Sequence, residues 1–342
     1  MISTLKRKLE FKLFQIWQSK QGPAKFLRPL SWLYCFIVIS RRFAYLLKIK
    51  KTERIEAPVI IVGNLTVGGT GKTPLVTWLT NYLKDQGYKP GIISRGYGGK
   101  ARHWPQQVRP DGDPVAVGDE AILISKRTAC PMAVGPERLI SGQELLHYHP
   151  GCNVIISDDG LQHYALHRDI EVAVIDGKLR FGNEYCLPAG SLREPLKRLK
   201  KVDFIVTNGQ AGEGEFAMRY NLSQACNIIE PRDILPLEKF IGQPVHAIAG
   251  IGNPERFFTQ LTEMGLDVIG HPFPDHYFYQ ETDLDFGDDK PVLMTEKDAV
   301  KCKRIGKPNY WYVPITVEVQ ETFGKAILDK LKEVTSRGQQ TA

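Results

Sequence analysis

The chain has 342 residues, of which 42% are hydrophobic and 10% aromatic. This composition excludes wholesale disorder and predicts a large core divided between two domains. Six scattered cysteines without a C-x-x-C pair argue against a zinc site or a disulfide framework and favour reduced, cytosolic thiols. The formal net charge of +7 is uneven, because residues 1–54 hold 13 Lys or Arg and two acidic residues. No nucleic-acid recognition motif accompanies this basic segment, so we expect no nucleic-acid partner.

The basic N-terminal segment also carries an apolar run, Leu30–Ile39, followed by two arginines. The run is about half as long as the roughly 20 residues that a membrane-spanning helix needs, and no signal-peptide cleavage site follows it. Trp17, Trp32 and Tyr34 are interleaved with Lys and Arg, a pattern typical of a helix lying in the headgroup region of an anionic leaflet. A core helix with a solvated basic end is the alternative, and the residues alone leave both open.

A strand that runs into a glycine-rich loop comes next. Residues 59–62 are apolar and β-branched, and the loop ends in Gly71-Lys72-Thr73 at the start of an amphipathic helix over residues 74–84. Inward-turned amides, the helix N-terminus, the lysine and the threonine hydroxyl together suit phosphates and Mg²⁺. The spacing departs from the usual phosphate-loop pattern, which has glycine where Thr66 stands. The alternative is a strand–helix turn without a ligand. The predicted nucleotide site consists of Thr66, Val67, Gly68, Gly69, Thr70, Gly71, Lys72 and Thr73.

Strands and helices alternate through the following residues. Apolar runs predict strands, and the segments between several of them predict helices at 119–126 and 136–147. This alternation favours an α/β fold with a P-loop-containing, doubly wound and mostly parallel sheet (α/β/α). A second α/β series follows the polar stretch 208–214 and ends in a helix from about residue 321. We therefore predict an N-terminal membrane-associating segment (1–54), a P-loop kinase domain (55–215) and a smaller C-terminal α/β domain (216–342). The predicted strands lie at 91–94, 132–134, 153–157, 171–175 and 203–207.

Two pairs of adjacent carboxylates are suited to nucleotide chemistry. Asp158 and Asp159 follow the strand at 153–157, where an acid lies near a phosphate loop and can hold Mg²⁺ directly or through water. Asp119 and Glu120 begin the helix at 119–126 and are candidates for a general base and a metal-associated acid. The alternatives are structural, because adjacent acids are common in turns and an Asp at a helix start can simply cap the backbone.

Two arginines and a histidine are further candidates. Arg193 lies in the loop Gly190-Ser-Leu-Arg-Glu-Pro195, and arginine stabilises phosphate charge in a way that lysine matches poorly. Arg138 begins the helix at 136–147 and is a second candidate for an anion contact. For both arginines a surface position is the alternative. His276 lies in a turn and could relay a proton for a carboxylate, although a lone histidine is more often structural.

Taken together, these motifs resemble those of the tetraacyldisaccharide 4′-kinases, the membrane-associated kinases of lipid A biosynthesis. The resemblance runs over most of the chain, and its specificity comes from the order and spacing of motifs that are each modest alone. Besides the basic aromatic N-terminus, the matching motifs are Val62-Gly-Asn-Leu-Thr-Val-Gly-Gly-Thr-Gly-Lys-Thr-Pro74, Ser94-Arg-Gly-Tyr-Gly98, Val117-Gly-Asp-Glu120, Val134-Gly-Pro-Glu-Arg138, Asp158-Asp-Gly-Leu-Gln-His163, Leu187-Pro-Ala-Gly-Ser-Leu-Arg-Glu194, Phe273-Pro-Asp-His276 and Thr295-Glu-Lys-Asp298.

The resemblance implies a reaction and a location. The reaction is ATP-dependent phosphorylation of the 4′-hydroxyl of a tetraacylated glucosamine disaccharide 1-phosphate, which yields lipid IVA, with ATP and Mg²⁺ as cofactors. The lipid acceptor implies a peripheral position on the cytoplasmic face of the inner membrane, against an anionic surface. No protein partner is implied.

The resemblance also implies roles for individual residues. Lys72 would contact the β- and γ-phosphates, and Asp119 would be the base, assisted by His276. Many relatives carry a second histidine where Tyr277 stands, so no catalytic role is expected at that position. The expected metal ligands are Thr73, Glu120 and Asp158. The remaining charged residues expected to organise phosphate or line the site are Asp159, Arg138, Arg193 and Glu194.

Two other functions are consistent with a phosphate loop. One is a nucleotide switch that hydrolyses ATP or GTP to control a membrane partner, and the other is a kinase of a soluble metabolite. Phosphorylation of the acylated disaccharide by the purified protein would separate the first from a lipid kinase. Independence from detergent or liposomes would indicate the second.

Overall fold

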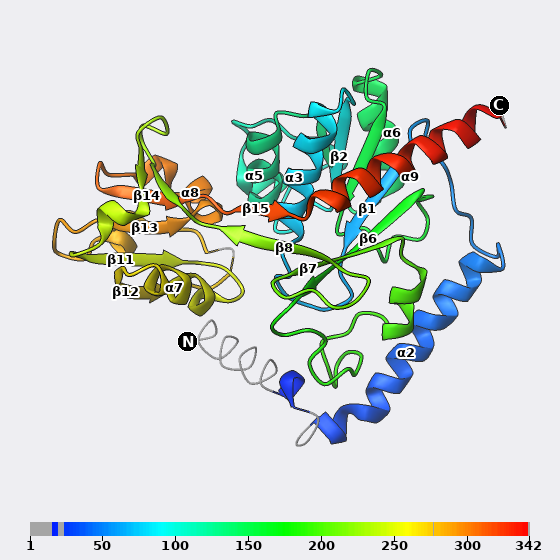
Figure 1. Cartoon of the computed structure of the whole chain (residues 1–342), viewed down its shortest axis with the longest axis horizontal. Helices are drawn as coiled ribbons and strands as arrows, with labels where there is room; N and C mark the ends of the chain where they lie inside the picture. The colour runs from blue at the N-terminus through cyan, green and yellow to red at the C-terminus, as the bar shows by residue number, and fades with distance from the viewer. Residues whose placement is uncertain (1–15, 20–23, 276, 341–342) are drawn as a thin grey trace.

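Parallel strands form the centre of the larger of two sheets in the computed structural model, which describes residues 16–19, 24–275 and 277–340 (Figure 1). Over these residues the larger sheet has the order β15-β8-β7-β6-β1-β5-β2-β4-β3, and only its edge strands β3 and β15 run antiparallel. The predicted doubly wound, mostly parallel sheet is therefore confirmed. Its strands are β1 (Val59–Gly63), β2 (Pro90–Ser94), β3 (Gln106–Gln107), β4 (Met132–Val134), β5 (Val154–Asp158), β6 (Ile170–Asp176), β7 (Phe204–Asn208), β8 (Phe216–Asn221) and β15 (Thr316–Val319).

Helices cover both faces of this sheet because its strands are apolar on both sides. In β1, Ile60 and Val62 pack into one core with α3 (Lys72–Asp85), α5 (Asp119–Thr128) and α9 (Glu321–Gln340). Val59 and Ile61 face the other way, into a core shared with α6 (Arg138–Tyr148). The short helix α4 (Pro114–Val117) immediately precedes α5, and the 3₁₀ helix η1 (Leu196–Lys201) precedes β7.

The smaller sheet has the order β10-β9-β14-β13-β11-β12 within the described residues. Its strands β12, β11, β13 and β14 are parallel, whereas β9 and β10 pair antiparallel at one edge. Its elements are β9 (Gln224–Asn227), β10 (Ile234–Pro236), η2 (Leu237–Phe240), β11 (Pro244–Ala249), α7 (Pro254–Glu263), β12 (Asp267–Pro272), η3 (Glu281–Leu284), β13 (Val292–Thr295), α8 (Glu296–Cys302), η4 (Lys303–Ile305) and β14 (Tyr310–Val313).

The two sheets do not divide the chain at residue 216, where the sequence suggested a boundary. Strand β8 still belongs to the larger sheet, and β15 returns to pair with it after the smaller sheet is complete. Helix α9 then packs on the larger sheet through the buried Phe323, Ile327 and Leu331. Two strands therefore connect the lobes, and the last helix crosses the larger lobe (Figure 1).

Helix α2 (Ala24–Leu46) extends along the outside of the larger lobe (Figure 1). Only Ala24 and Ser31 of this helix are buried. Two hydroxyls fasten it to the lobe: Ser31 Oγ donates to the carbonyl oxygen of Cys186 at 2.7 Å, and Tyr34 OH donates to that of Arg193 at 3.2 Å. In the described part of the chain no helix has both the length and the apolar character needed to cross a membrane.

The loop between β1 and α3 depends on two glycines with left-handed backbone angles, Gly68 (φ 119°) and Gly71 (φ 102°). The amide of Val67 donates to the carbonyl oxygen of Ser191 at 2.8 Å, and Thr66 forms a bridge with Leu192, so a second loop supports the first. Residues 66–73 therefore adopt the strand–loop–helix arrangement that their sequence predicts.

Gly71 has no room for a side chain. A Cβ atom at this position would lie 2.8 Å from Met218 Cε and 2.9 Å from Tyr220 OH, whereas one at Gly69 would meet nothing within 4 Å. Because the backbone angle is also unfavourable for L-residues, Gly71→Ala should destabilise the fold by roughly 1–3 kcal/mol. Urea unfolding measures this, with Gly69→Ala as the matched control. Equal stability of the two variants would contradict the packing described for Gly71.

Candidate active site

The phosphate loop and the adjacent strand β5 bring opposite charges together at the carboxyl edge of the larger sheet. Val62 of β1 is in register with Asp158 of β5, so Asp159 lies beside the start of α3. Lys72 Nζ is 3.8 Å from Asp159 Oδ1, and Arg193 Nη1 donates to both Asp159 oxygens at 2.9 Å. Burial raises the pKa of Asp159, but Lys72 and Arg193 outweigh it, so the pKa is lowered and the carboxylate stays charged.

Asp158 is buried at the end of β5 and has one carboxylate oxygen without a partner. Its Oδ2 accepts a hydrogen bond from Ser94 Oγ at 2.9 Å, while its Oδ1 is buried and unbonded among the described residues. Burial, followed by the charges of Asp159 and Glu120, raises the pKa of Asp158 to about 6. An unpaired carboxylate oxygen in this position is suited to a cation.

Arg138 is inside the protein and not on its surface. Its side chain is only 2% exposed, and its guanidinium donates to the carbonyl oxygens of Gly135 and Asp158 at 2.9 and 3.0 Å. Burial lowers its pKa to about 10, against the opposing effect of Asp158 and Asp159. The surface position considered for Arg138 is therefore wrong. Its charge is buried next to the backbone of Asp158.

Asp119 and Glu120 reach the same region from α5. Gly118, with a φ of 95°, caps the helix, so Asp119 is its first residue and not its cap. Asp119 Oδ1 accepts from the amide of Glu120 at 2.9 Å, and its side chain is buried. The charge of Glu120 contributes to the raised pKa of Asp158, which places the two pairs of carboxylates within electrostatic range of one another.

Glu194 has a different environment from its neighbour Arg193. It is buried, and its carboxylate accepts hydrogen bonds from the hydroxyl of Tyr164 and from Gln162 Nε2, the latter at 3.2 Å. Arg198 Nε is 3.8 Å from Glu194 Oε2. The described contacts of Glu194 thus support the segment after β5, a network that was not predicted from the sequence.

Several groups at the site did not receive a role from the sequence. Ser94 donates a hydrogen bond to the Asp158 carboxylate. In the sequence, the feature that could have indicated this role is the position of Ser94 at the end of a predicted parallel strand. Lys297 Nζ lies 3.1 Å from Glu120 Oε1 and comes from the smaller lobe, which only the tertiary fold reveals. His163 follows the aspartates, and burial, then Arg138 and Arg95, lowers its pKa to about 4, so it is neutral at physiological pH. His276 lies outside the described residues.

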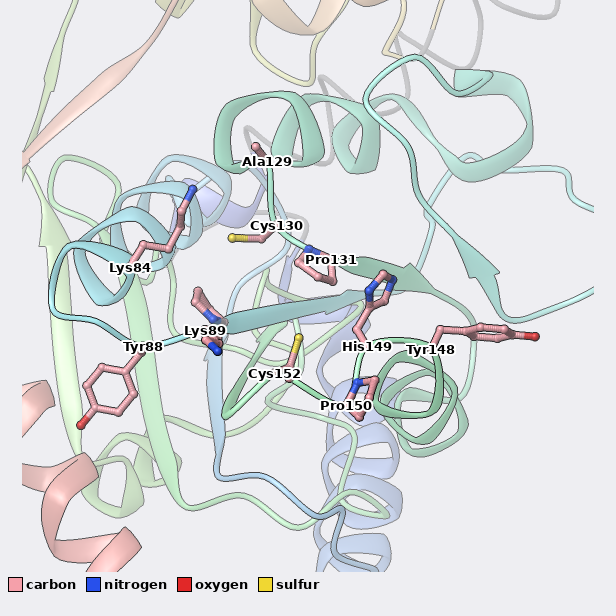
Figure 2. Close-up of a pocket in the computed structure, with 12 residues that line it drawn as sticks. Lys84, Tyr88, Lys89, Ala129, Cys130, Pro131, Tyr148, His149, Pro150 and Cys152 are labelled. Atoms are coloured by element: carbon pink, nitrogen blue, oxygen red, sulfur yellow. The ribbon is translucent and has the colours of Figure 1, made fainter.

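A separate hollow of about 500 Å³ lies at the opposite end of the larger sheet. Lys84 and Tyr148, at the C-terminal ends of α3 and α6, line it (Figure 2). Pro90, at the start of β2, lines it as well. The side chains of Cys130 and Cys152 also line it. Because the phosphate loop is at the other end of α3, this hollow is not part of the candidate active site.

Within the described parts of the chain, no group of three or more His, Cys, Asp or Glu side chains could hold a metal on its own. In nucleotide sites Mg²⁺ is usually held by one or two protein carboxylates, and phosphates and water complete its coordination. The unpaired Asp158 oxygen and the position of Thr73 in the first turn of α3 fit that arrangement.

Comparisons with known proteins agree over nearly the whole chain. The family model of LpxK, tetraacyldisaccharide-1-P 4′-kinase, matches residues 23–332. The tetraacyldisaccharide 4′-kinase of Nitrosococcus oceani is 53% identical over 325 residues, which cover 95% of this chain and 96% of that protein. The enzyme of the same name from Methylobacillus flagellatus is 48% identical over 322 residues, covering 94% and 96%.

A solved structure has the same fold. The "apo" form of LpxK from Aquifex aeolicus in complex with ATP is 29% identical and superposes with a TM-score of 0.76, covering 91% of this chain and 100% of that one. This chain belongs to the tetraacyldisaccharide-1-phosphate 4′-kinase family.

Proposed function

We propose that this chain transfers the γ-phosphate of ATP to the 4′-hydroxyl of tetraacyldisaccharide 1-phosphate, forming lipid IVA in lipid A biosynthesis. The observation that carries this proposal is the position of Lys72, whose ammonium group is 3.8 Å from Asp159 at the edge where the carboxylates gather. Membership of a kinase family over residues 23–332 favours a kinase over a nucleotide switch.

The residues at this edge divide into those that hold the nucleotide and those that balance its charge. The loop amides of residues 66–73 and the N-terminus of α3 bind the phosphates, and the Lys72 ammonium neutralises charge on the β- and γ-phosphates. Arg193 and Arg138 supply two further positive charges beside Asp159 and Asp158. Phosphoryl transfer depends chiefly on such alignment and charge neutralisation.

The metal ligands that we propose are Thr73, Glu120 and Asp158. The unbonded Oδ1 of Asp158 supports a cation at this position, because a buried carboxylate oxygen without a partner is otherwise unfavourable. Mg²⁺, when bound, would neutralise phosphate charge and orient the γ-phosphate. Ser94 fixes the other oxygen of Asp158 and so sets the direction of the carboxylate.

The acceptor hydroxyl must lose its proton, and we propose that the carboxylate of Asp119 accepts it. This side chain is buried at the start of α5, and its Oδ2 lies 4.0 Å from Lys297 Nζ and 3.9 Å from Lys301 Nζ. A carboxylate positioned in this way can act as a general base. We propose that His276 assists Asp119. Its neighbour in sequence, Asp275, is 3.2 Å from Lys297 Nζ, and the same ammonium group is 4.0 Å from Asp119.

The acyl chains of the acceptor require access from a lipid surface, and α2 is suited to provide it. Trp32 and Phe36 of this helix are each 68% exposed, and Phe26 and Leu33 are exposed as well. Basic residues of the same segment add attraction to anionic headgroups. We propose that α2 holds the enzyme peripherally on the cytoplasmic face of the inner membrane.

The main test is phosphorylation of the acylated disaccharide 1-phosphate by purified protein with Mg-ATP. Lys72→Ala should lower kcat roughly 100- to 1,000-fold, because it removes one preorganised charge from the transition state. Lys325→Ala, on the exposed side of α9, is the matched control and should keep full activity. ATP hydrolysis without phosphorylated lipid, or near-native turnover of Lys72→Ala, would contradict the proposed function.

Asp119→Asn tests the base. The substitution keeps the size of the side chain and removes its proton-accepting charge, so kcat should fall roughly 10²- to 10⁴-fold. Equilibrium binding of ATP should change little, because the phosphate loop is intact. If the variant lost only affinity for ATP and turned over normally at saturation, the assignment of the base would have to be withdrawn.

The double variant Trp32→Ser/Phe36→Ser tests the role of α2. Each exposed aromatic side chain that enters the interface contributes about 1.5–3 kcal/mol when fully buried, so binding to anionic vesicles in a flotation assay should weaken by at least about tenfold. ATP binding should be unchanged. Ile234→Ser is the control, because Ile234 is exposed on the smaller lobe. Undiminished vesicle binding by the double variant would exclude this face of α2 as the membrane contact.

A further inference from the structure

Lys297 lies where carboxylates from both lobes converge. It belongs to α8 of the smaller lobe, and its Nζ is 3.1 Å from Glu120 Oε1 and 4.0 Å from Asp119 Oδ2, both on α5 of the larger lobe. The same ammonium group is 3.2 Å from Asp275 Oδ1, in the segment after β12. One cation therefore joins the helix that carries the proposed base to the residue before His276.

The environment keeps this ammonium group charged and in place. The side chain of Lys297 is 14% exposed, and carboxylate oxygens of Glu120, Asp275 and Asp119 lie 3.1, 3.2 and 4.0 Å from its Nζ. Two hydrogen bonds hold the start of α8. The Thr295 hydroxyl accepts from the amide of Asp298, and the Asp298 carboxylate accepts from the amide of Gly250 at 2.9 Å.

Adhesion between the lobes does not depend on Lys297 alone. Arg127 of α5 forms a two-point ion pair with Glu296 and also donates to the carbonyl oxygen of Ile315. On the other side of the phosphate loop, Arg256 of α7 donates to Asp176 Oδ2 at 2.8 Å. These contacts dock the smaller lobe without involving the proposed base.

We propose that Lys297 is a positioning residue for phosphoryl transfer, which fixes the carboxylate of Asp119 relative to Asp275 of the smaller lobe. It acts through these carboxylates and not by contact with the reacting atoms. Direct lobe-to-lobe ion pairing suits this task, because Asp119 and Asp275 come from different lobes. The inference rests on the proposed function, since it assigns a role within that reaction.

The test compares Lys297→Met and Lys297→Arg in the lipid phosphorylation assay. A small misplacement of a reacting group costs about 100-fold, so Lys297→Met should lower kcat by about 10- to 100-fold. Its KM for ATP should change much less than kcat, because the described partners of Lys297 include Glu120 of the proposed metal site but no residue of the loop at 66–73. Lys297→Arg keeps the charge and should recover a substantial part of kcat. Full kcat in Lys297→Met would overturn the proposal.

Arg127→Met separates positioning from adhesion. This variant removes a cation of the same interface that is not bonded to the proposed base, so it should lower the melting temperature and leave kcat nearly unchanged. An equal loss of kcat in Arg127→Met and Lys297→Met would show that lobe adhesion explains both, and the proposal would fail. Wild-type protein that does not phosphorylate the lipid would contradict the proposed function itself.

A double-mutant cycle of Lys297→Met with Asp275→Asn gives a second measurement. Residues that act as one unit have strongly non-additive effects on kcat. The double variant should therefore lose about as much activity as the more impaired single variant. Losses that simply multiply would mean that Lys297 and Asp275 act independently, which would contradict the arrangement inferred here.

Discussion

The ion pairs of Asp159 with Lys72 and Arg193 are the constraint on which the site depends. They join three segments that are far apart in sequence: the phosphate loop, the end of β5 and the loop before η1. Each cation is close to where phosphate charge is expected, so the same residues that stabilise the loop are available to a nucleotide. The left-handed backbone of Asp159, with a φ of 49°, is maintained by these contacts in spite of its local cost.

The smaller lobe contributes charged side chains to the site, whereas the phosphate loop belongs to the larger lobe. Lys297 and Asp275 approach α5 from one side, and Arg256 approaches Tyr220 and Asp176 near Gly71 from the other. The return of the chain through β15 and α9 gives the smaller lobe two connections to the larger sheet. Its position is thus limited by covalent geometry before any ligand binds, which suits groups that must meet across a boundary.

Local sequence was sufficient to predict those parts of the site in which a single segment supplies both the backbone geometry and the reactive side chains. The β1–loop–α3 unit follows from apolar β-branched residues, glycines and Lys72 in order, and the aspartates follow because parallel strands end at one edge. The strands β8 and β15 were not predicted, because Phe216–Asn221 and Thr316–Val319 mix polar with apolar residues. The surroundings of Glu194 and Lys297 depend mainly on contacts between distant segments, such as Tyr164 with Glu194 and Lys297 with Glu120, and these contacts form only in the folded chain.

The loop at residues 186–193 links the proposed membrane helix to the phosphate loop. On one side, Ser31 and Tyr34 of α2 donate to the carbonyl oxygens of Cys186 and Arg193. On the other, Ser191 accepts from the amide of Val67, and the Arg193 side chain holds Asp159. A lipid acceptor that reaches the enzyme along α2 therefore meets a segment bonded directly to the nucleotide loop. If α2 lies on the membrane as proposed, these bonds set the height of the phosphate site above the lipid surface, so that the acyl chains can stay in the bilayer while the sugar hydroxyl reaches the γ-phosphate.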